Sequence, residues 1–318
     1  MFGRLRRIQM VEYIPIVFCF DETYSNYGAV AIFSVLSSSD VPVKIYCLVP
    51  SSDVEKMASI QAMNKILDSD ITVIGADDRA FFAWKEVGHI TRATYLRLFM
   101  PDLINEDKVI YLDADLIVRS DLSELFATST DQFFIAGVPD PLGGRTSRMP
   151  RAQDDVYING GVMVMNLKGL RQDRFLEKCA RIYSSHPDLV TWMDQCLINK
   201  YAENRKTILD PRWNRQISAD TITPEEWSDF VSHDSSSIIH FLGSTKPWDP
   251  WCNPRIAGFW RDYANKLQTE LGTTLQVARH SNDNRSEPRS SGNIPQRRNS
   301  LCLCGSGKKY KHCHGAFG

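Results

Sequence analysis

The stretch "VIYLDADLIV", residues 109–118, places two carboxylates in the middle of an otherwise apolar run. Its first four residues are β-branched, aromatic or aliphatic and show no alternation of polar positions, which predicts a buried strand. Asp113 and Asp115 follow where this strand should end. Because residues two apart in an extended chain point the same way, both carboxylates should face one pocket, with Ala114 turned aside.

Two carboxylates that face one pocket repel each other. At a separation of about 5 Å and an effective dielectric constant near 20, the repulsion is roughly 3 to 4 kcal/mol, so a proton, an arginine or a metal ion should compensate it. A pair of oxygen ligands suits Mg²⁺ or Mn²⁺. The pattern by itself is also compatible with two aspartates in a surface turn, one of which caps the next segment.

Length and composition place the chain among globular proteins. It has 318 residues, 43% of them hydrophobic, which is enough to bury a core in one large domain or two smaller ones. No apolar stretch approaches the roughly 20 uncharged residues of a spanning helix, and "MFGRLRRIQM" is followed too soon by Glu12 and Pro15 to be a signal peptide. We therefore expect a cytoplasmic protein, with peripheral association with the inner membrane left open.

Cysteines and charges separate the C-terminal tail from the rest of the chain. Five scattered cysteines are expected to be reduced core thiols: Cys19, Cys47, Cys179, Cys196 and Cys252. The other three lie within residues 302–313. Residues 271–318 carry eight Lys or Arg against two acids, which leaves a net charge of −7 for residues 1–270. The tail is therefore treated as a separate unit.

Apolar runs alternate with helical patterns in the N-terminal part of the chain. The runs at residues 14–20, 43–49 and 71–75 predict strands, and residues 27–37 and the segment after Ser51 predict helices. This order predicts an α/β fold, in which a mostly parallel sheet carries helices on both faces.

Three further segments continue this pattern. Residues 91–104 predict a helix, and residues 108–118 contain the next predicted strand. Asp121 and Glu124 have the spacing of a capping box that opens a short helix.

The ends of the predicted strands locate a binding crevice. Ligands of such sheets bind beyond the carboxyl ends of the strands, where Asp21 and Asp113 should both reach. No GxGxxG or GxxxxGK[ST] pattern is present, which argues against a dinucleotide-binding fingerprint or a P-loop. Phosphates would instead be held by a metal on the aspartate pair, helped by a base such as Arg97 or Lys246.

Two motifs in the middle of the chain carry polar residues beside apolar ones. In "YINGGVMVMNL", residues 157–167, Asn159 precedes two glycines that would let a ligand approach the backbone, or that form a turn before a strand. In "WMDQCLIN", residues 192–199, Asp194 and Gln195 lie near the start of a predicted helix, where they are site residues or an N-cap.

A third motif, "IIHFLGSTKPW" at residues 238–248, ends an apolar strand with His240. Gly243 and Ser244 predict a loop, and Lys246 follows it. The imidazole is either structural or completes a ligand set with the two aspartates of the DxD pattern.

The order of six motifs resembles a known family. "FDETYSNY", "TYLRL", "YLDADLIV", "INGGVMVMNL", "DQCLIN" and "HFLGSTKPW" follow one another as in the family 8 retaining glycosyltransferases. These include bacterial lipopolysaccharide galactosyl- and glucosyltransferases, and glycogenin is more distantly related. The resemblance covers residues 14–265 and implies a GT-A fold, with a mostly parallel mixed sheet flanked by helices, in a domain of residues 1–270.

The resemblance also implies roles for individual residues. The metal, Mn²⁺ or Mg²⁺, would be bound by Asp113, Asp115 and His240. The UDP-sugar would contact Cys19, Asp21, Thr23, Tyr24, Arg97, Asp113, Ala114, Asp115, Asn159, Gly160, Asp194, Gln195, His240, Gly243 and Lys246. Within this set, Gln195, Asp194, Asp113 and Arg97 would be catalytic. Thr23 departs from the asparagine common at its position, which should weaken one ribose contact.

The implied reaction is transfer of galactose or glucose from a UDP-sugar to a saccharide, such as lipopolysaccharide or another cell-surface glycan, with retention at the anomeric carbon. Mn²⁺ and Lys246 would stabilise the leaving UDP. Retention requires a covalent intermediate or attack from the leaving-group face. Gln195 occupies the expected nucleophile position, and because an amide oxygen is a poor nucleophile, we favour front-face attack with the β-phosphate as base.

The C-terminal string "CLCGSGKKYKHCHG", residues 302–315, predicts a structural Zn²⁺ site. Its ligands would be Cys302, Cys304, Cys313 and His314. The C-x-C spacing is tighter than the usual C-x₂-C, but the string resembles the SEC-C motif, a zinc knuckle at the C-terminus of the bacterial secretion ATPase. We expect a flexible basic linker at residues 271–300 and the knuckle at residues 301–318.

The lysines of the knuckle leave its partner open. Lys308, Lys309 and Lys311 fit an acidic protein or ribosomal partner, and they equally fit a solvated basic face.

Two other functions are compatible with parts of this pattern. A sugar nucleotidyltransferase also uses aspartate-bound Mg²⁺ in an α/β crevice, but it usually carries a glycine-rich, basic N-terminal loop that is absent here. A degenerate nucleotide-sugar binder that acts through its zinc knuckle would not need the intact set of Asp113, Asp115, His240 and Lys246.

Overall fold

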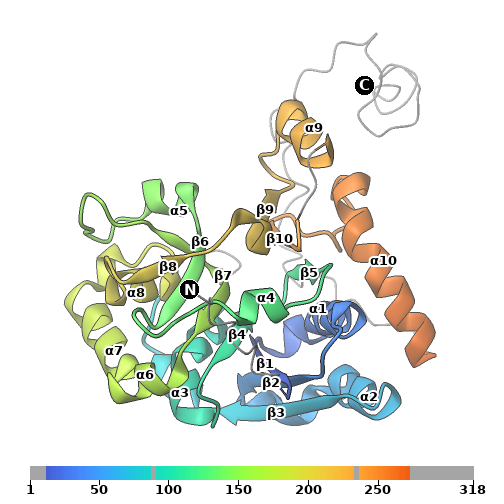
Figure 1. Cartoon of the computed structure of the whole chain (residues 1–318), viewed down its shortest axis with the longest axis horizontal. Coiled ribbons are helices and arrows are strands. Elements are labelled where there is room, and N and C mark those ends of the chain that lie inside the picture. Colours follow the sequence, from blue (N-terminus) through green and yellow to red (C-terminus); the bar gives the residue numbers. More distant parts are fainter. Residues whose placement is uncertain (1–11, 87–90, 233–235, 273–318) are drawn as a thin grey trace, which may run out of the picture.

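The computed structural model describes residues 12–86, 91–232 and 236–272 (Figure 1). Of the predicted linker, Leu271 ends the helix α10 (Pro254–Leu271) and Gly272 caps it, and residues 273–300 lie outside this part of the chain. The predicted zinc ligands Cys302, Cys304, Cys313 and His314 also lie outside it.

The strands of the described residues form two sheets. The larger sheet has the order β3 (Asp70–Ala76), β2 (Val43–Pro50), β1 (Ile14–Cys19), β4 (Val109–Leu112), β7 (Ile158–Met165), β6 (Ile135–Pro139) and β8 (Lys206–Ile208). The smaller sheet has the order β5 (Leu116–Val118), β10 (Ile238–Leu242) and β9 (Arg215–Ser218). Strands β1 to β4 are parallel, whereas β7 runs antiparallel to both β4 and β6, so the predicted mixed sheet is confirmed.

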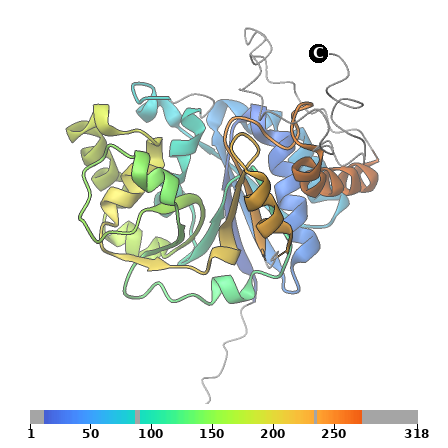
Figure 2. The same cartoon turned by 90° about the horizontal axis from the view of Figure 1, so that it is seen from above.

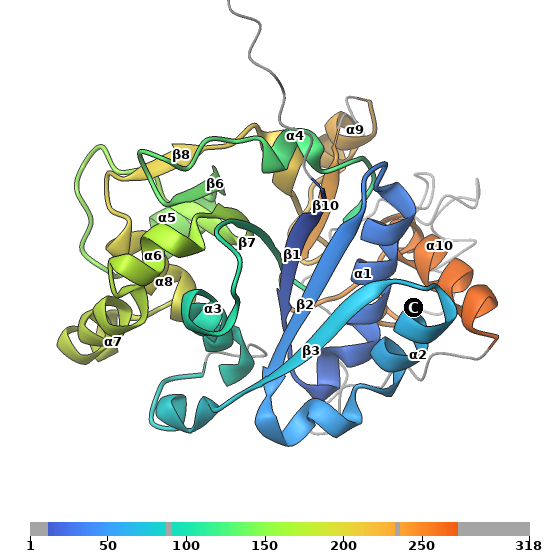
Figure 3. The same cartoon turned by 60° about the horizontal axis from the view of Figure 1, so that its bottom comes forward.

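Helices cover both faces of the larger sheet, as predicted. One face carries α1 (Ser25–Ser38), α2 (Ala58–Ile66) and α10 (Pro254–Leu271), and the other carries α3 (Met100–Leu103), α6 (Leu167–Gln172), α7 (Phe175–Ser185) and α8 (Met193–Tyr201). Figures 2 and 3 show these two groups on opposite sides of the strands. Three further helices are α4 (Ser123–Phe126), α5 (Pro141–Thr146) and α9 (Pro224–Ser232).

Short 3₁₀ segments connect several of these elements. They are η1 (Glu22–Tyr24), η2 (Ser51–Lys56), η3 (Asp78–Phe81), η4 (Arg92–Phe99), η5 (Pro187–Leu189) and η6 (Pro211–Asn214).

The packing of the core explains why the sequences of the strands are continuous apolar runs. Along β1, Ile16 and Phe18 pack into the cluster beneath α1, while Val17 and Cys19 pack into the cluster beneath α7 and α8. Both faces of the strand are therefore buried, and neither set of positions is polar. The five described cysteines are free and buried, as predicted.

The predicted strand end at Asp113 is confirmed, whereas the assignment of the whole run 108–118 to the same strand is wrong. β4 ends at Leu112, and β5 begins at Leu116 in the other sheet, where it pairs antiparallel with β10. The Asp113 N–H donates to the Gly161 carbonyl of the larger sheet (2.8 Å), and the Asp115 carbonyl accepts from Phe241 N of the smaller sheet (3.0 Å). The DxD segment is therefore the junction between the two sheets.

Three other local predictions need correction. Residues 91–104 form the 3₁₀ segment η4 followed by α3, whose first turn contains Pro101, a residue without the N–H that a helix interior requires. The predicted capping box does not form, because the Asp121 carboxylate accepts from Ser123 N (2.8 Å) and Glu124 pairs with Arg212. His240 is the third residue of β10 rather than its end.

No helix within the described residues combines the length and apolar character needed to cross a membrane.

Candidate active site

A cavity of about 370 Å³ opens where the larger sheet meets the smaller one. Its wall includes the residues that follow β1 and β4, the start of α8, and the loop after β10. The predicted site residues that line it are Cys19, Asp21, Tyr24, Arg97, Asp113, Ala114, Asp115, Asn159, Asp194, Gln195, His240, Gly243 and Lys246. Thr23 and Gly160 are not part of this wall.

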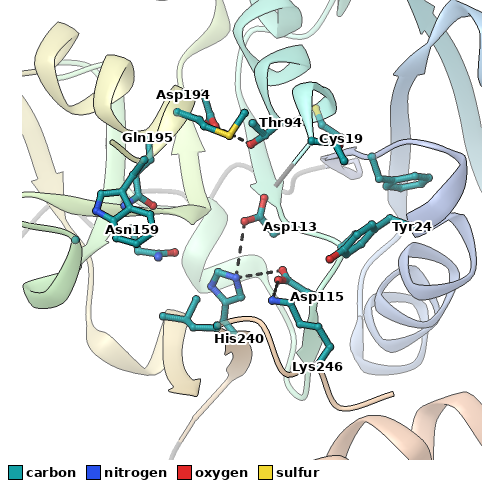
Figure 4. A pocket seen from close by; sticks show the side chains of 18 of the residues that line it. Cys19, Tyr24, Thr94, Asp113, Asp115, Asn159, Asp194, Gln195, His240 and Lys246 are labelled. Carbon is teal, nitrogen blue, oxygen red and sulfur yellow. Dashed lines mark hydrogen bonds and ion pairs between the residues drawn. The ribbon is translucent and has the colours of Figure 1, made fainter. Parts of the chain in front are cut away.

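The two DxD carboxylates meet the imidazole of His240 inside this cavity (Figure 4). His240 Nε2 lies 3.2 Å from Asp115 Oδ1 and 3.7 Å from Asp113 Oδ2. One ligand atom from each of the three residues lies within 4.8 Å of the others. Two carboxylate oxygens and one imidazole nitrogen are a donor set that suits Mn²⁺ or Mg²⁺, so these residues fit a divalent cation.

Separate cations compensate the two aspartates. Arg97 Nη2 donates to Asp113 Oδ1 (3.0 Å), which also accepts from the Tyr111 hydroxyl (2.6 Å). Lys246 Nζ donates to Asp115 Oδ2 (2.7 Å). Burial alone would raise the pKa of Asp115, but Lys246 and His240 outweigh it and hold this pKa well below its usual range. The Asp115 carboxylate therefore keeps its charge without a proton.

Arg97 connects the cluster of Asp113, Asp115 and His240 to α8. Its side chain is only 6% exposed, its Nη1 donates to the Gly160 carbonyl (2.7 Å), and its Nε lies 2.8 Å from Asp194 Oδ2. The other oxygen of Asp194 accepts from the Thr94 hydroxyl (2.6 Å). Burial raises the pKa of Asp194 to about 6, although Arg97 acts in the opposite direction.

Gln195 is held at both ends of its amide. Its Oε1 accepts from Gly160 N (2.8 Å), and its Nε2 donates to Asp140 Oδ2 (3.0 Å). Asp140 is buried and also caps α5 by accepting from Gly143 N (2.7 Å). Sequence reasoning missed Asp140, yet it directly follows β6 as Asp113 follows β4, so the strand-end rule would have found it.

The two glycines after Asn159 lie within β7, so these residues do not form a turn before a strand. A Cβ atom at Gly161 would overlap Cε1 of His240 and would lie 2.8 Å from Asp113 Oδ2. The imidazole of His240 therefore fills the space beside Gly161. The sequence predicted that a ligand would approach the backbone there.

The loop after β10 is shaped by two aspartates. Asp220 Oδ2 accepts from Ser244 N (2.7 Å) and Thr245 N (3.1 Å), and Asp249 Oδ2 accepts from Lys246 N (2.7 Å). Gly243 has a φ of 85°, a left-handed conformation that favours glycine. This loop directs Lys246 towards Asp115. Asp220 was not predicted, because neither its spacing nor its neighbours form a motif.

The loop after β1 forms the opposite wall. The Thr91 hydroxyl donates to Asp21 Oδ2 (2.7 Å), and Tyr24 packs edge-on against Trp248 with ring centroids 5.9 Å apart. Thr23 is exposed and donates to the other oxygen of Asp21. It therefore orients Asp21 rather than facing the cavity.

Comparison with known proteins defines the class. Residues 15–252 match the family model of glycosyl transferase family 8, and the chain belongs to this family. Residues 298–316, outside the described part, match the model of the SEC-C motif. Both matches agree with the resemblance seen in the sequence.

Individual relatives are similar over most of the chain. General stress protein A of Bacillus subtilis (strain 168) is 26% identical over 254 residues, which are 75% of this chain and 88% of that protein. Lipopolysaccharide 1,2-glucosyltransferase of Escherichia coli (strain K12) is 25% identical over 264 residues, 78% of this chain and 76% of that protein. Glycosyltransferase GlyD of Streptococcus pneumoniae is 27% identical, but the chain spans only 30% of its length.

Solved structures show that the fold is the GT-A glycosyltransferase fold. The galactosyltransferase LgtC, crystallised with donor and acceptor sugar analogs, superposes with a TM-score of 0.69. It is 22% identical, and the match covers 85% of this chain and 99% of that one.

Proposed function

We propose that this glycosyltransferase transfers galactose or glucose from a UDP-sugar to a saccharide acceptor, with retention of configuration and dependence on Mn²⁺. The acceptor would be lipopolysaccharide or another cell-surface glycan. The single observation that carries the proposal is the Asp113, Asp115 and His240 set, which lies beside Lys246 at the floor of the cavity.

The charge of the cavity supports the need for a divalent cation. Among the described residues that line it, six are aspartates, Asp21, Asp113, Asp115, Asp140, Asp194 and Asp220, and only Arg97 and Lys246 are permanent cations. A nucleoside diphosphate that entered this cavity without a cation would be repelled by the aspartates. Asp113, Asp115 and His240 would hold the cation, which when bound supplies the charge that stabilises the leaving diphosphate.

The remaining residues would position the donor. Lys246 is fixed by Asp115 and by the Phe241 carbonyl (2.7 Å), and it would place a positive charge beside the phosphates. The guanidinium of Arg97 pairs with both Asp113 and Asp194 and fixes their positions. In this position Asp194 would accept a hydrogen bond from a hydroxyl of the hexose. Uridine would lie against Cys19, Asp21 and Tyr24.

The contacts of Gln195 bear on the mechanism. Its amide oxygen already accepts from Gly160 N, and its amide nitrogen is engaged by Asp140, so the group is oriented and only one lone pair of the oxygen is left. Such an oxygen would stabilise positive charge on the anomeric carbon rather than attack it. This arrangement favours front-face attack, with the donor phosphate accepting the proton of the acceptor hydroxyl.

We also propose the division into a catalytic unit at residues 1–270, a linker at residues 271–300 and a zinc knuckle at residues 301–318. The match to the SEC-C motif supports the knuckle and its four ligands. The family match argues against a sugar nucleotidyltransferase, and the complete metal-ligand set argues against a degenerate binder.

A screen of UDP-sugars for hydrolysis without any acceptor tests this function. We expect release of the hexose from UDP-galactose or UDP-glucose with Mn²⁺ and none in excess EDTA. Asp115→Asn is the matched control, because it removes one ligand charge and keeps the side-chain volume. Equal hydrolysis by wild type and Asp115→Asn would reject the proposal.

A further inference from the structure

Asn214 is a buried polar residue that no sequence motif identifies. It is the last residue of η6, directly before β9, and its side chain is 1% exposed. β9 pairs in parallel with β10, where Gln216 is opposite His240, so Asn214 lies two residues before the partner of His240 and on the same face of the strand. The amide of Asn214 makes two hydrogen bonds, one to Asn159 and one to His240.

The orientation of these amides follows from one backbone group. Gly161 N lies 2.9 Å from Asn159 Oδ1 and, as a backbone N–H, it only donates. This atom of Asn159 is therefore the oxygen. Asn214 approaches the same oxygen at 2.9 Å, so it must present its Nδ2 there.

The other end of the Asn214 amide then determines the proton on His240. Asn214 Oδ1 lies 3.0 Å from His240 Nδ1, and because an amide oxygen only accepts, Nδ1 must carry a proton. In a neutral imidazole this leaves the lone pair on Nε2, the nitrogen that faces Asp115 and Asp113.

We propose that Asn214 is a positioning residue that holds the Nδ1 proton of His240 and so directs a bare Nε2 towards the divalent cation. The inference rests on the proposed function in that His240 is taken as a metal ligand. Groups that hold the second nitrogen of a metal-binding histidine typically change metal affinity by about 10- to 100-fold when they are removed.

Three variants separate this role from a purely structural one. Asn214→Asp keeps an oxygen for His240 Nδ1, while it replaces the donor to Asn159 with an oxygen and adds a buried negative charge. Asn214→Leu removes both hydrogen bonds at similar volume. Asn199→Leu is the matched control, because this buried asparagine also bonds to β7, through Ile158 N (2.8 Å) and Ile158 O (2.9 Å), without touching His240.

Calorimetric titration of Mn²⁺ in the presence of UDP is the first measurement. We expect Asn214→Leu to bind Mn²⁺ about 10- to 100-fold more weakly than wild type, and Asn214→Asp and Asn199→Leu to stay within a few-fold. If Asn214 were only structural, all three variants would lose thermal stability, and their Mn²⁺ affinities would not follow this order. Equal Mn²⁺ affinity of Asn214→Leu and wild type would overturn the inference.

The second measurement does not depend on metal affinity. Nitrogen-15 NMR of histidine-labelled wild type, with the His240 signal assigned by its loss in His240→Gln, reports which ring nitrogen is protonated. We expect a proton on Nδ1 both in the metal-free protein and with Mg²⁺ and UDP. An unprotonated Nδ1 in both would overturn the inference. Failure of wild type to bind Mn²⁺ would reject the proposed metal dependence, and the NMR result would still decide the role of Asn214.

Discussion

Gly161→Ala should disable the metal site by adding one methyl group. The added Cβ would overlap Cε1 of His240 and lie 2.7 Å from His240 Nδ1 and 2.8 Å from Asp113 Oδ2. Non-bonded carbon atoms prefer separations of about 3.5 to 4.0 Å, so the ring must move by about 1 Å. It cannot do so freely, because Asn214 holds its Nδ1 and the ring is buried.

The expected size of the effect has two parts. Overpacking of a filled site costs about 1 to 3 kcal/mol, which for a chain of this size lowers Tm by roughly 2 to 12 °C. The second part is loss of ligand stabilisation. At 100 times its Kd, a ligand stabilises the folded state by about 2.7 kcal/mol, and a variant with a displaced His240 should lose most of this gain with Mn²⁺ and UDP.

Thermal unfolding with and without Mn²⁺ and UDP measures both parts, and hydrolysis of the UDP-sugar measures activity. A displacement of about 1 Å in a catalytic site typically lowers activity by about 10²-fold. Gly258→Ala is the control, since a Cβ there meets nothing within 4 Å, and this exchange in α10 should stabilise the helix by about 0.5 to 1 kcal/mol. A Gly161→Ala protein that gains as much Tm from Mn²⁺ and UDP as wild type would refute the reasoning.

Four further predictions test the site and the tail. Asp113→Asn and Asp115→Asn should each abolish both the Tm gain from Mn²⁺ with UDP and turnover, and full wild-type activity in excess EDTA would contradict this. Gln195→Ala should lower kcat far more than UDP affinity measured by calorimetry, whereas an equal loss of affinity would make Gln195 a binding residue. Because burial raises the pKa of Asp194 to about 6, its charge destabilises the folded state above pH 6 and this penalty disappears towards pH 4. Urea unfolding should thus show wild type gaining about 2 kcal/mol relative to Asp194→Asn as the pH falls from 7 to 4, and a change in the opposite direction would exclude this assignment. Truncation after residue 280 should leave the rate of hydrolysis within a few-fold of wild type, and elemental analysis should find one zinc fewer per chain. A folded but inactive truncated protein would show that the knuckle belongs to the active site.

Local sequence patterns were sufficient for the first three strands. The strands at residues 14–20, 43–49 and 71–75 were predicted to within one residue at every end, because strands buried on both faces need continuous apolar runs. The shared direction of Asp113 and Asp115 was also predicted, since it depends only on residues two apart.

The same local rules failed where a distant element decided the outcome. The run 108–118 is apolar enough for one strand, but its second half pairs with β10, more than a hundred residues later, and the strand breaks at the DxD segment. The capping box failed for the same reason, because Arg212 from η6 pairs with Glu124. Local propensity sets only a preference, and the partners available in the folded chain override it.

Residue types and their order thus identified the α/β fold, the family and the three residues Asp113, Asp115 and His240 that the structure brings together, because apolar periodicity and motif chemistry are contained within short segments. Packing of distant segments decided the rest: the junction of two sheets at Asp113 and Asp115, the hold of Asp140 on Gln195, the space that Gly161 leaves for His240, and the hydrogen bond from His240 to Asn214. These contacts join residues from different strands and helices. Their existence depends on strand order and register, which no short segment encodes.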